Sequence, residues 1–268
     1  MLSYIVSLTT IPSKFVNVYK TIDSIVSQTI LPIKIIINIP RKYTFRFQGS
    51  EISEDELNNF KLKYTKHNVF VNLIDNDYGP GTKLLGLLDS DMLNRFAPCN
   101  GDFPCMACEN TYIILIDDDL IYKPNMIEEF DKEIKASAIS VASFCVYINH
   151  TIEMAQGADG LLIKLSKLHR FNYKKSFYEY YQVIKNEDYI GFHDDFYISY
   201  YFYLMKENIH SMKQVNNCCI YDTHSGTLID TLAHLEGKYS RKLITSKIFE
   251  ILEGLKLKGY FNFLMESI

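Results

Sequence analysis

The 268-residue sequence has no tryptophan and only six cysteines. So few cysteines do not form the dense disulfide framework of small secreted domains, and they suit a reducing compartment. No apolar run approaches the roughly 18 residues that a membrane-spanning helix needs. The net charge of -4 shows no basic excess for binding nucleic-acid phosphates. The composition therefore favours a globular protein without a nucleic-acid partner.

The start of the chain also lacks the features of a secretory signal. The first eight residues carry no basic segment and run directly into Thr9, Thr10 and Pro12. A signal peptide needs a positively charged start and a longer apolar stretch. We therefore expect a cytoplasmic protein. The amphipathic segment 244–255 is expected to pack on the domain, and association with a membrane surface is the less favoured alternative.

What the sequence does contain is a regular alternation of apolar, strand-length segments with segments of helical period. We expect strands at residues 3–8, 34–39, 69–74 and 112–116, and helices over 15–26, 53–62, 84–88 and 126–134. In the second helix, Ser53 and Glu56 fit a capping box. Such alternation predicts a mostly parallel sheet covered by helices on both faces.

The remaining segments are predicted from turn residues and from spacing. Residues 95–110 contain two prolines and a glycine and are expected to form a loop. Pro124 is expected in the first turn of the fourth helix. Residues 139–148 are rich in strand-forming residues, residues 157–160 form a turn, and a further helix is expected from Asp194 to Asn208.

Three consecutive acids, Asp117, Asp118 and Asp119, directly follow the most apolar predicted strand. Open α/β sheets bind their ligands at the carboxyl ends of strands. If the chain stays extended there, Asp117 and Asp119 point to one side and Asp118 to the other. A divalent cation such as Mg²⁺ or Mn²⁺, shared with substrate phosphates, would relieve the repulsion between the two carboxylates. The alternative is a solvated acidic loop.

This strand and triplet, Ile114 to Leu120, resemble the DxD motif of GT-A glycosyltransferases, in which the acids bridge ribose and diphosphate through a metal. Three further segments are similar to parts of that family and occur in the same order. They are Ser7 to Pro12, which resembles the nucleotide-base pocket, Asp77 to Leu85, which resembles the lining of base and ribose, and Asp194 to Ser199, which resembles the acidic pair of inverting members.

The resemblance implies a fold and a division of the chain. It implies an α/β, GT-A (Rossmann-like) fold with a mostly parallel central sheet flanked by helices and a C-terminal helical appendage. Residues 1–268 would form one domain, with a nucleotide-sugar-binding half at 1–124, an acceptor and catalytic half at 125–225, and a helical segment at 226–268.

The resemblance also implies roles for the residues that bind the donor. Thr9, Thr10 and Pro12 would contact the base, and Asp77 would hydrogen-bond it. Lys83 would approach the ribose or diphosphate, unless it is a solvated lysine on a helix face.

The acidic residues receive roles in the same way. Asp117 would serve the ribose or the metal, and Asp119 would bind the metal. Asp118 would bridge these two or face solvent. Asp159, in the turn beneath the donor sugar, would accept a hydrogen bond from a sugar hydroxyl. His224 is a candidate further metal ligand, with an ordinary hydrogen-bonded or exposed histidine as the alternative.

The catalytic base implied by the resemblance is Asp195, with Asp194 as the second candidate. Both lie where a helix is expected to begin, so capping of that helix is the alternative. The expected activity is inverting, metal-dependent transfer of a sugar from a nucleotide-sugar, a UDP-sugar above all, to a hydroxyl of a glycan or glycoconjugate. Two alternatives are an inactive nucleotide- or carbohydrate-binding module of the same fold and, less favoured, a phosphatase of the haloacid dehalogenase type.

Overall fold

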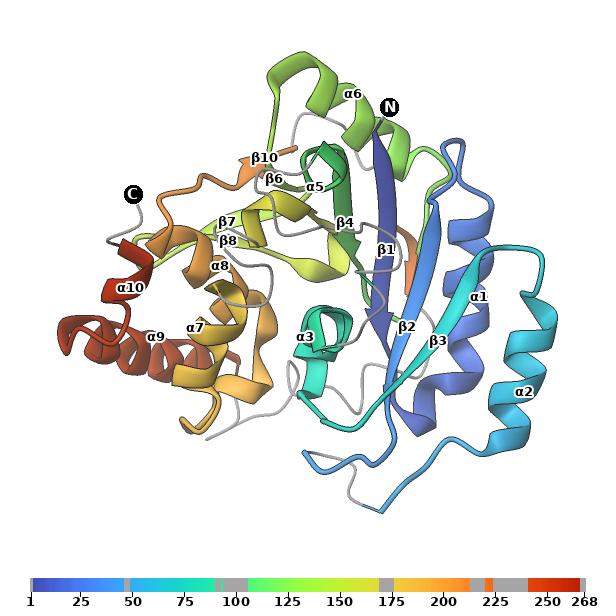
Figure 1. Cartoon of the computed structure of the whole chain (residues 1–268), viewed down its shortest axis with the longest axis horizontal. Helices are drawn as coiled ribbons and strands as arrows, with labels where there is room; N and C mark the ends of the chain where they lie inside the picture. The colour runs from blue at the N-terminus through green and yellow to red at the C-terminus, as the bar shows by residue number, and fades with distance from the viewer. Residues whose placement is uncertain are drawn as a thin grey trace.

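The computed structural model describes residues 2–45, 49–89, 93, 106–168, 176–212, 220–223 and 241–265. The side chains of residues 176, 220–223, 241, 242 and 265 are outside this description. Within it, strands and helices alternate through the first half as the sequence predicts (Figure 1). In order, these elements are β1 (Ser3–Thr9), η1 (Pro12–Lys14), α1 (Phe15–Val26), β2 (Lys34–Pro40), α2 (Glu54–Lys63), β3 (Val69–Ile74), η2 (Gly79–Gly81), α3 (Thr82–Asp89), α5 (Met106–Asn110), β4 (Thr111–Leu115), β5 (Leu120–Tyr122) and α6 (Met126–Ser137).

The second half contains shorter strands and a group of helices. These elements are β6 (Val141–Ser143), β7 (Val146–Asn149), β8 (Ile152–Ala155), η3 (Gly157–Asp159), β9 (Leu161–Lys164), η4 (Leu165–Leu168), α7 (Ser176–Ile184), η5 (Ile190–Phe192), α8 (Asp194–Leu204), β10 (His210–Ser211), β11 (Ile220–Thr223), α9 (Arg241–Leu257) and α10 (Asn262–Met265). None of the helices in the described ranges is long and apolar enough to span a membrane.

A seven-stranded sheet in the order β10-β6-β9-β4-β1-β2-β3 forms the centre of the molecule. All its pairings are parallel except those that β9 makes with β4 and β6. The predicted α/β class with a mostly parallel, helix-flanked sheet is therefore confirmed. From β1 the chain first extends the sheet through β2 and β3, and only later returns to add β4 on the other side. This reversal makes the carboxyl ends of β1 and β4 the place where ligands of such sheets bind.

Alternate residues of each central strand face opposite layers, as the two-residue period of a strand requires. On one face, Val6, Ile37 and Ile114 pack in a cluster with α1, α2 and α6. On the other face, Ile36 and Ile113 pack in a cluster with α3, α7, α8 and α9. Figure 1 shows the two helical layers on either side of the sheet.

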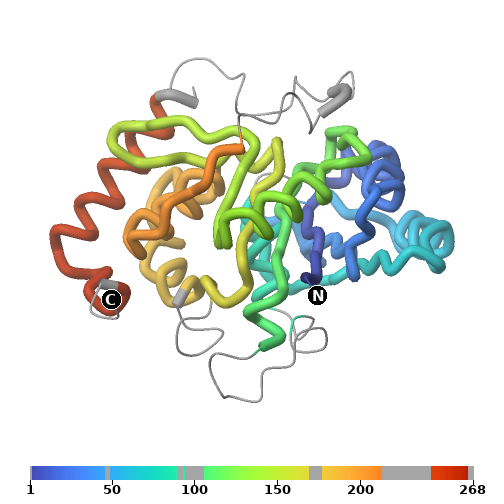
Figure 2. Tube along the Cα trace, turned by 90° about the horizontal axis from the view of Figure 1, so that it is seen from above, coloured from blue at the N-terminus to red at the C-terminus, as the bar shows by residue number. Residues whose placement is uncertain are grey.

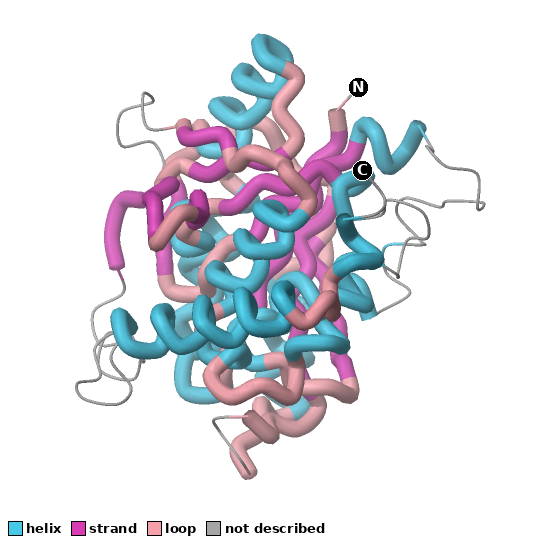
Figure 3. Tube along the Cα trace, turned by 90° about the vertical axis from the view of Figure 1, so that its left-hand side faces the viewer, coloured by secondary structure: helices cyan, strands magenta, loops and turns pink. Residues whose placement is uncertain are grey.

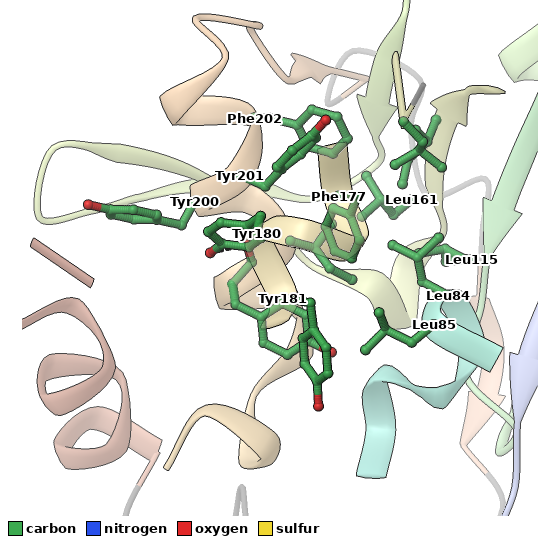
Figure 4. Close-up of a cluster of buried hydrophobic side chains, with 14 of the residues drawn as sticks. Leu84, Leu85, Leu115, Leu161, Phe177, Tyr180, Tyr181, Tyr200, Tyr201 and Phe202 are labelled. Atoms are coloured by element: carbon green, nitrogen blue, oxygen red, sulfur yellow. Dashed lines mark hydrogen bonds between the residues drawn. The ribbon is translucent and has the colours of Figure 1, made fainter. Parts of the chain in front are cut away.

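An aromatic core fills the layer between the sheet and the C-terminal helices. Phe177, Tyr180 and Tyr201 are almost completely buried, and their rings contact one another (Figure 4). Tyr180 donates a hydrogen bond from its hydroxyl to the carbonyl oxygen of Tyr197 at 2.9 Å. Helix α8 is buried on nearly every side, with Tyr203 its only exposed residue. Its first turn is consequently held in a fixed position.

The terminal amphipathic helix packs on the domain, as predicted. Ile244, Ile248 and Leu252 of α9 are buried in the same cluster as α8. Figure 2 shows α9 running along the outside of the helical layer. Figure 3, which faces that side, shows helices lying across the strands behind them.

Three predictions about element boundaries were wrong. Residues 106–110, expected in a loop, form the short helix α5. Pro124 precedes Asn125, the N-cap of α6, and so lies just outside the helix. Helix α8 ends at Leu204, four residues before the predicted end, because Lys206 adopts a left-handed conformation with φ of 53°.

A chain of buried polar groups crosses the sheet beneath α3. Asn38 Nδ2 donates to Ser7 Oγ at 2.9 Å, and Asn72 Nδ2 donates to Asn38 Oδ1 at 2.7 Å. Ser7 Oγ in turn donates to the carbonyl oxygen of Lys83 at 2.6 Å, and Asn72 also donates to that of Gly86. The first turn of α3, including Lys83, is thereby fixed to three adjacent strands.

We expect Asn38→Ala to lower the free energy of unfolding by about 1 to 3 kcal/mol, because it leaves buried partners without hydrogen bonds. Urea unfolding measures this change. The matched control is Asn59→Ala at an exposed position of α2, which should shift stability by less than about 0.5 kcal/mol. Equal effects of the two substitutions would contradict a structural role for the polar chain.

Candidate active site

A pocket lies at the carboxyl ends of β1 and β4, where the direction of chain progression reverses. Its volume is about 200 Å³. Since a water molecule occupies about 30 Å³ of liquid, the space holds several waters and is more than a packing defect. Its walls combine apolar and charged groups and consist of Thr9, Thr10, Ile11, Lys14, Tyr43, Phe45, Gly79, Pro80, Lys83, Ile116, Asp117, Asp118 and Asp119.

The acid triplet forms one side of this pocket and is held by its backbone. The amide of Asp117 donates to Tyr122 Oη at 3.1 Å, and Thr21 Oγ1 donates to the carbonyl oxygen of Asp118 at 2.8 Å. Residues 118 and 119 lie in a turn, so the predicted extended alternation is wrong. Asp118 does not face solvent but is buried, with its side chain 11% exposed.

Lys14 compensates the charge of the two acids in the turn. Its Nζ lies 2.9 Å from Asp119 Oδ2 and 4.0 Å from Asp118 Oδ1. Burial raises the pKa of Asp118 to about 6, although Lys14 opposes the shift. Burial by itself would lower the pKa of Lys14, but Asp118 and Asp119 outweigh it and raise that pKa. Two lysines thus share the triplet: Lys14 contacts Asp118 and Asp119, and Lys83 contacts Asp117.

That second lysine, Lys83, lies between the triplet and the Asp194–Asp195 pair. Its Nζ is 2.8 Å from Asp117 Oδ1, 3.0 Å from Asp194 Oδ2 and 4.0 Å from Asp195 Oδ1, and its side chain is only 4% exposed. Burial opposes the charged form, but the three carboxylates hold the pKa of Lys83 well above its usual value. Lys83 is therefore a charged, buried link between two acidic segments and not a solvated lysine.

Two glycines make room for this link. A Cβ on Gly157 would lie 2.5 Å from Asp195 Oδ1 and 3.0 Å from Lys83 Nζ. A Cβ on Gly81 would lie 1.7 Å from Tyr197 Oη. The first turn of α8 thus packs directly against the backbone of η2 and η3, which explains why small residues stand at both positions.

The predicted base residues, Asp194 and Asp195, lie in the first turn of α8 and are both buried. Burial raises the pKa of Asp195 to about 7, Asp194 adds to the shift, and Lys83 opposes it. Asp194 Oδ2, Asp195 Oδ1 and Tyr197 Oη accept or donate no hydrogen bond among the described residues. Asp194 Oδ2 nevertheless lies at ion-pair distance from Lys83, so its charge is compensated without hydrogen-bond geometry.

The predicted donor-binding residues fall into two groups. Thr9, Thr10 and Lys83 line the pocket, whereas Pro12 and Asp77 lie outside its lining. Pro12 begins the turn η1 that carries Lys14. Asp77 accepts hydrogen bonds from the backbone of two adjacent segments, from the amides of residues 44 and 45 at 2.8 Å and from that of residue 79 at 2.9 Å.

Asp159 is not among the residues that line the pocket. Asp159 lies in η3. Burial raises the pKa of Asp159, and the nearby negative charge of Asp117 raises it further. His224 lies outside the described residues, and its predicted role stays a prediction. Thr223, directly before it in sequence, pairs with Leu120, directly after Asp119.

The sequence interpretation missed Lys14, Tyr43, Phe45 and Tyr122. Tyr122 donates a hydrogen bond to the carbonyl oxygen of Ala158 at 2.8 Å and so joins the triplet to η3. The hydroxyl of Tyr43 donates a hydrogen bond to the carbonyl oxygen of Thr10 at 2.9 Å. A signal was present, because Lys14, Tyr43 and Phe45 all follow the carboxyl end of a predicted strand.

The donor set of the triplet suits a hard divalent cation shared with a ligand. Within the described ranges, no three His, Cys, Asp or Glu side chains are grouped closely enough to hold an ion by themselves. Mg²⁺ is usually bound by one or two carboxylates together with phosphate oxygens and water. Asp117 and Asp119, 37% and 19% exposed, offer two such carboxylates at the pocket.

No protein-family model matches the chain, and no curated protein matches it. Among solved structures, TarS residues 1–349 from S. aureus in complex with UDP-GlcNAc aligns with 13% identity and a TM-score of 0.37, over 56% of this chain and 36% of that one. The mannosyltransferase PcManGT from Pyrobaculum calidifontis, in complex with GDP-Man and Mn²⁺, aligns with 10% identity and a TM-score of 0.41, over 63% of this chain and 46% of that one. The chain thus matches less than half the length of either protein.

We expect Lys83→Met to lower the free energy of unfolding by about 3 to 5 kcal/mol at pH 8, because the buried Asp194 and Asp195 and the half-buried Asp117 lose their shared cation. Thermal and urea unfolding measure the change. Lys132→Met is the control, since Lys132 is 57% exposed and pairs only with acids on its own helix. A loss no larger than that of the control would show that Lys83 does not hold the two acidic segments together.

Asp195 gives a pH-dependent prediction. Its pKa in the folded protein, about 7, exceeds its ordinary value of 3.8, so the folded state holds the proton more tightly. Its contribution to stability is therefore full at low pH and is lost as the pH rises from about 4 to about 7. We expect Asp195→Asn to raise the free energy of unfolding by about 1 to 2 kcal/mol at pH 8, with little gain at pH 4.

Unfolding curves recorded from pH 4 to pH 8 test this expectation. Asp75→Asn is the control, because Asp75 is 88% exposed and should give no such trend. A gain from Asp195→Asn that stays constant with pH would contradict the raised pKa.

Proposed function

We propose that the chain is an inverting, metal-dependent glycosyltransferase of the GT-A type. It would transfer a sugar from a nucleotide-sugar, with a UDP-sugar as the expected donor, to a hydroxyl of a glycan or glycoconjugate. The observation that supports this most strongly is the position of Lys83, which joins the acid triplet at the sheet's switch point to the Asp194–Asp195 pair. Residues 1–124 would bind the donor and residues 125–225 the acceptor.

The pocket is suited to a nucleoside diphosphate. Tyr43 and Phe45 offer aromatic faces for a base, and Thr9 and Thr10 offer backbone at the end of β1. Lys14 provides positive charge in the same pocket. Asp77 would act on the base side through the backbone segments that it holds and not by direct contact, because both its oxygens already accept hydrogen bonds from backbone amides.

Mg²⁺ or Mn²⁺ would be held by Asp117 and Asp119 together with the diphosphate oxygens, and His224 remains a candidate third ligand. When bound, the cation would stabilise the negative charge that grows on the departing diphosphate. In this arrangement Lys83 and Lys14 keep the two carboxylates oriented toward the pocket. Asp159 would lie near the donor sugar.

Asp195 is proposed as the general base. The best base has a pKa near the working pH, and burial raises that of Asp195 to about 7. Its carboxylate would take the proton of the acceptor hydroxyl while that oxygen bonds to the anomeric carbon. The bond from the anomeric carbon to the diphosphate breaks, and its electron pair leaves with the diphosphate oxygen. One direct displacement of this kind inverts the anomeric configuration.

The test is release of free nucleotide from a panel of nucleotide-sugars with MnCl₂. UDP-GlcNAc and GDP-mannose, the ligands of the two aligned structures, belong in the panel. We expect slow release that stops when the metal is chelated. Asp195→Asn should lower the rate by about 100-fold or more while UDP still binds, because the variant removes only the base. Asp119→Asn should weaken binding itself.

Asp75→Asn is the matched control, because Asp75 is far more exposed than Asp119 or Asp195. This variant should leave both nucleotide release and UDP binding unchanged. Binding of UDP without release, and with no effect of Asp195→Asn, would indicate an inactive binding module. Absence of metal-dependent binding for every nucleotide-sugar in the panel would contradict the proposal altogether.

A further inference from the structure

The ring of Phe45 connects the pocket to the segment that leads into Asp194 and Asp195. Phe45 lines the pocket and also packs against Phe192, with ring centroids 4.8 Å apart. Phe192 ends η5, and only His193 separates it from the first turn of α8. One side chain therefore contacts both the proposed donor site and the approach to the proposed base.

The ring of Phe45 packs directly on two glycines, Gly191 and Gly79. A Cβ on Gly191 would lie 2.6 Å from Phe45 Cε2 and 2.7 Å from its Cζ. A Cβ on Gly79 would lie 2.9 Å from Phe45 Cδ1 and 2.8 Å from the carbonyl oxygen of Gly191. Heavy atoms do not approach so closely, so neither position accepts a larger residue unless the ring moves.

The backbone at Phe45 is fixed as well. Asp77 Oδ2 accepts hydrogen bonds from the amides of Thr44 and Phe45, each at 2.8 Å. The other oxygen of Asp77 accepts from the amide of Gly79 at 2.9 Å. The single carboxylate of Asp77 thus holds both the backbone of Phe45 and the backbone of Gly79, on which the Phe45 ring packs.

We propose that Phe45 is a positioning residue that sets the placement of the Asp194–Asp195 turn relative to a nucleotide in the pocket, and that Asp77 acts through it. This inference rests on the proposed function. A nucleotide base that packs on the exposed face of Phe45 presses the ring onto Gly191, one residue before Phe192. Donor binding thereby fixes the segment from which the base carboxylate extends.

Gly191 provides a way to move the ring from outside the pocket, since it is not part of the pocket lining. Its backbone lies outside the left-handed region, so alanine is compatible with its conformation. We expect Gly191→Ala to displace the ring and to lower turnover at saturating donor by about 10- to 100-fold, since a displacement of about 1 Å can have that effect. A residue that only forms a wall would change KM and leave kcat unaltered.

The decisive comparison is a double-mutant cycle of Gly191→Ala and Phe45→Ala. If the ring transmits the effect, the Gly191→Ala substitution does no further harm once the ring is gone, and the double variant has the turnover of Phe45→Ala alone. If the two losses multiply instead, Phe45 does not transmit the effect and the inference is overturned. Gly254→Ala is the control, because nothing lies within 4 Å of a Cβ at that helical position.

A second readout needs no nucleotide. The amides of Phe192 and His193 are hydrogen-bonded to the carbonyl oxygens of Tyr189 and Ile190. If Phe45 fixes this turn, Phe45→Ala should accelerate hydrogen exchange at these two amides by about tenfold, with core amides of β1 unchanged. Unchanged exchange at residues 192 and 193 overturns the positioning role, even if the unmodified protein turns over a nucleotide-sugar. Failure of the unmodified protein to use any nucleotide-sugar counts against the proposed function only.

Discussion

The candidate site depends on one buried ammonium group. Lys83 Nζ lies within 4.0 Å of carboxylates from both acidic segments of the chain. Without it, three neighbouring carboxylates, two of them buried, would repel one another. Much of the surrounding structure fixes this one group: Ser7 binds the Lys83 carbonyl oxygen, Asn38 and Asn72 support Ser7, and Gly157 leaves space for the side chain.

This arrangement also explains why a helix as apolar as α8 can begin with two acids. The helix is buried along its length, so its first turn has little access to solvent. The helix dipole and Lys83 compensate part of the charge there. The compensation is incomplete, because burial still raises the pKa of Asp195 to about 7. A carboxylate in such a position suits the role of general base that we propose for Asp195.

The sequence predicted the fold well because its signals are local. The strands at residues 69–74 and 34–39 and the capping box at Ser53 follow from alternation and spacing that neighbouring residues determine. The resemblance also implied that Thr9 and Asp117 serve the same donor, and both residues line one pocket. Boundaries were less predictable. The end of α8 depends on the left-handed conformation of Lys206, for which the sequence carries no glycine.

Contacts between distant segments were beyond the sequence. No pattern of neighbouring residues indicates that Lys83 faces Asp194 or that Lys14 faces Asp118. The same holds for the hydrogen bonds that Asp77 accepts from backbone amides. The residues themselves were recognisable as candidates, but their partners are set by tertiary packing. One signal of such a contact was present: Asn38 and Asn72 interrupt apolar strands at paired positions, and polar residues in buried strands generally have specific partners.

The most direct measurement is the electron density of the protein crystallised with UDP and Mn²⁺. We predict the uracil ring beside Tyr43 and Phe45, the metal on Asp117 and Asp119, and the diphosphate directed toward Lys83 and Asp195. A nucleotide bound elsewhere, or bound in this pocket with its diphosphate directed away from the acid triplet, would contradict this prediction.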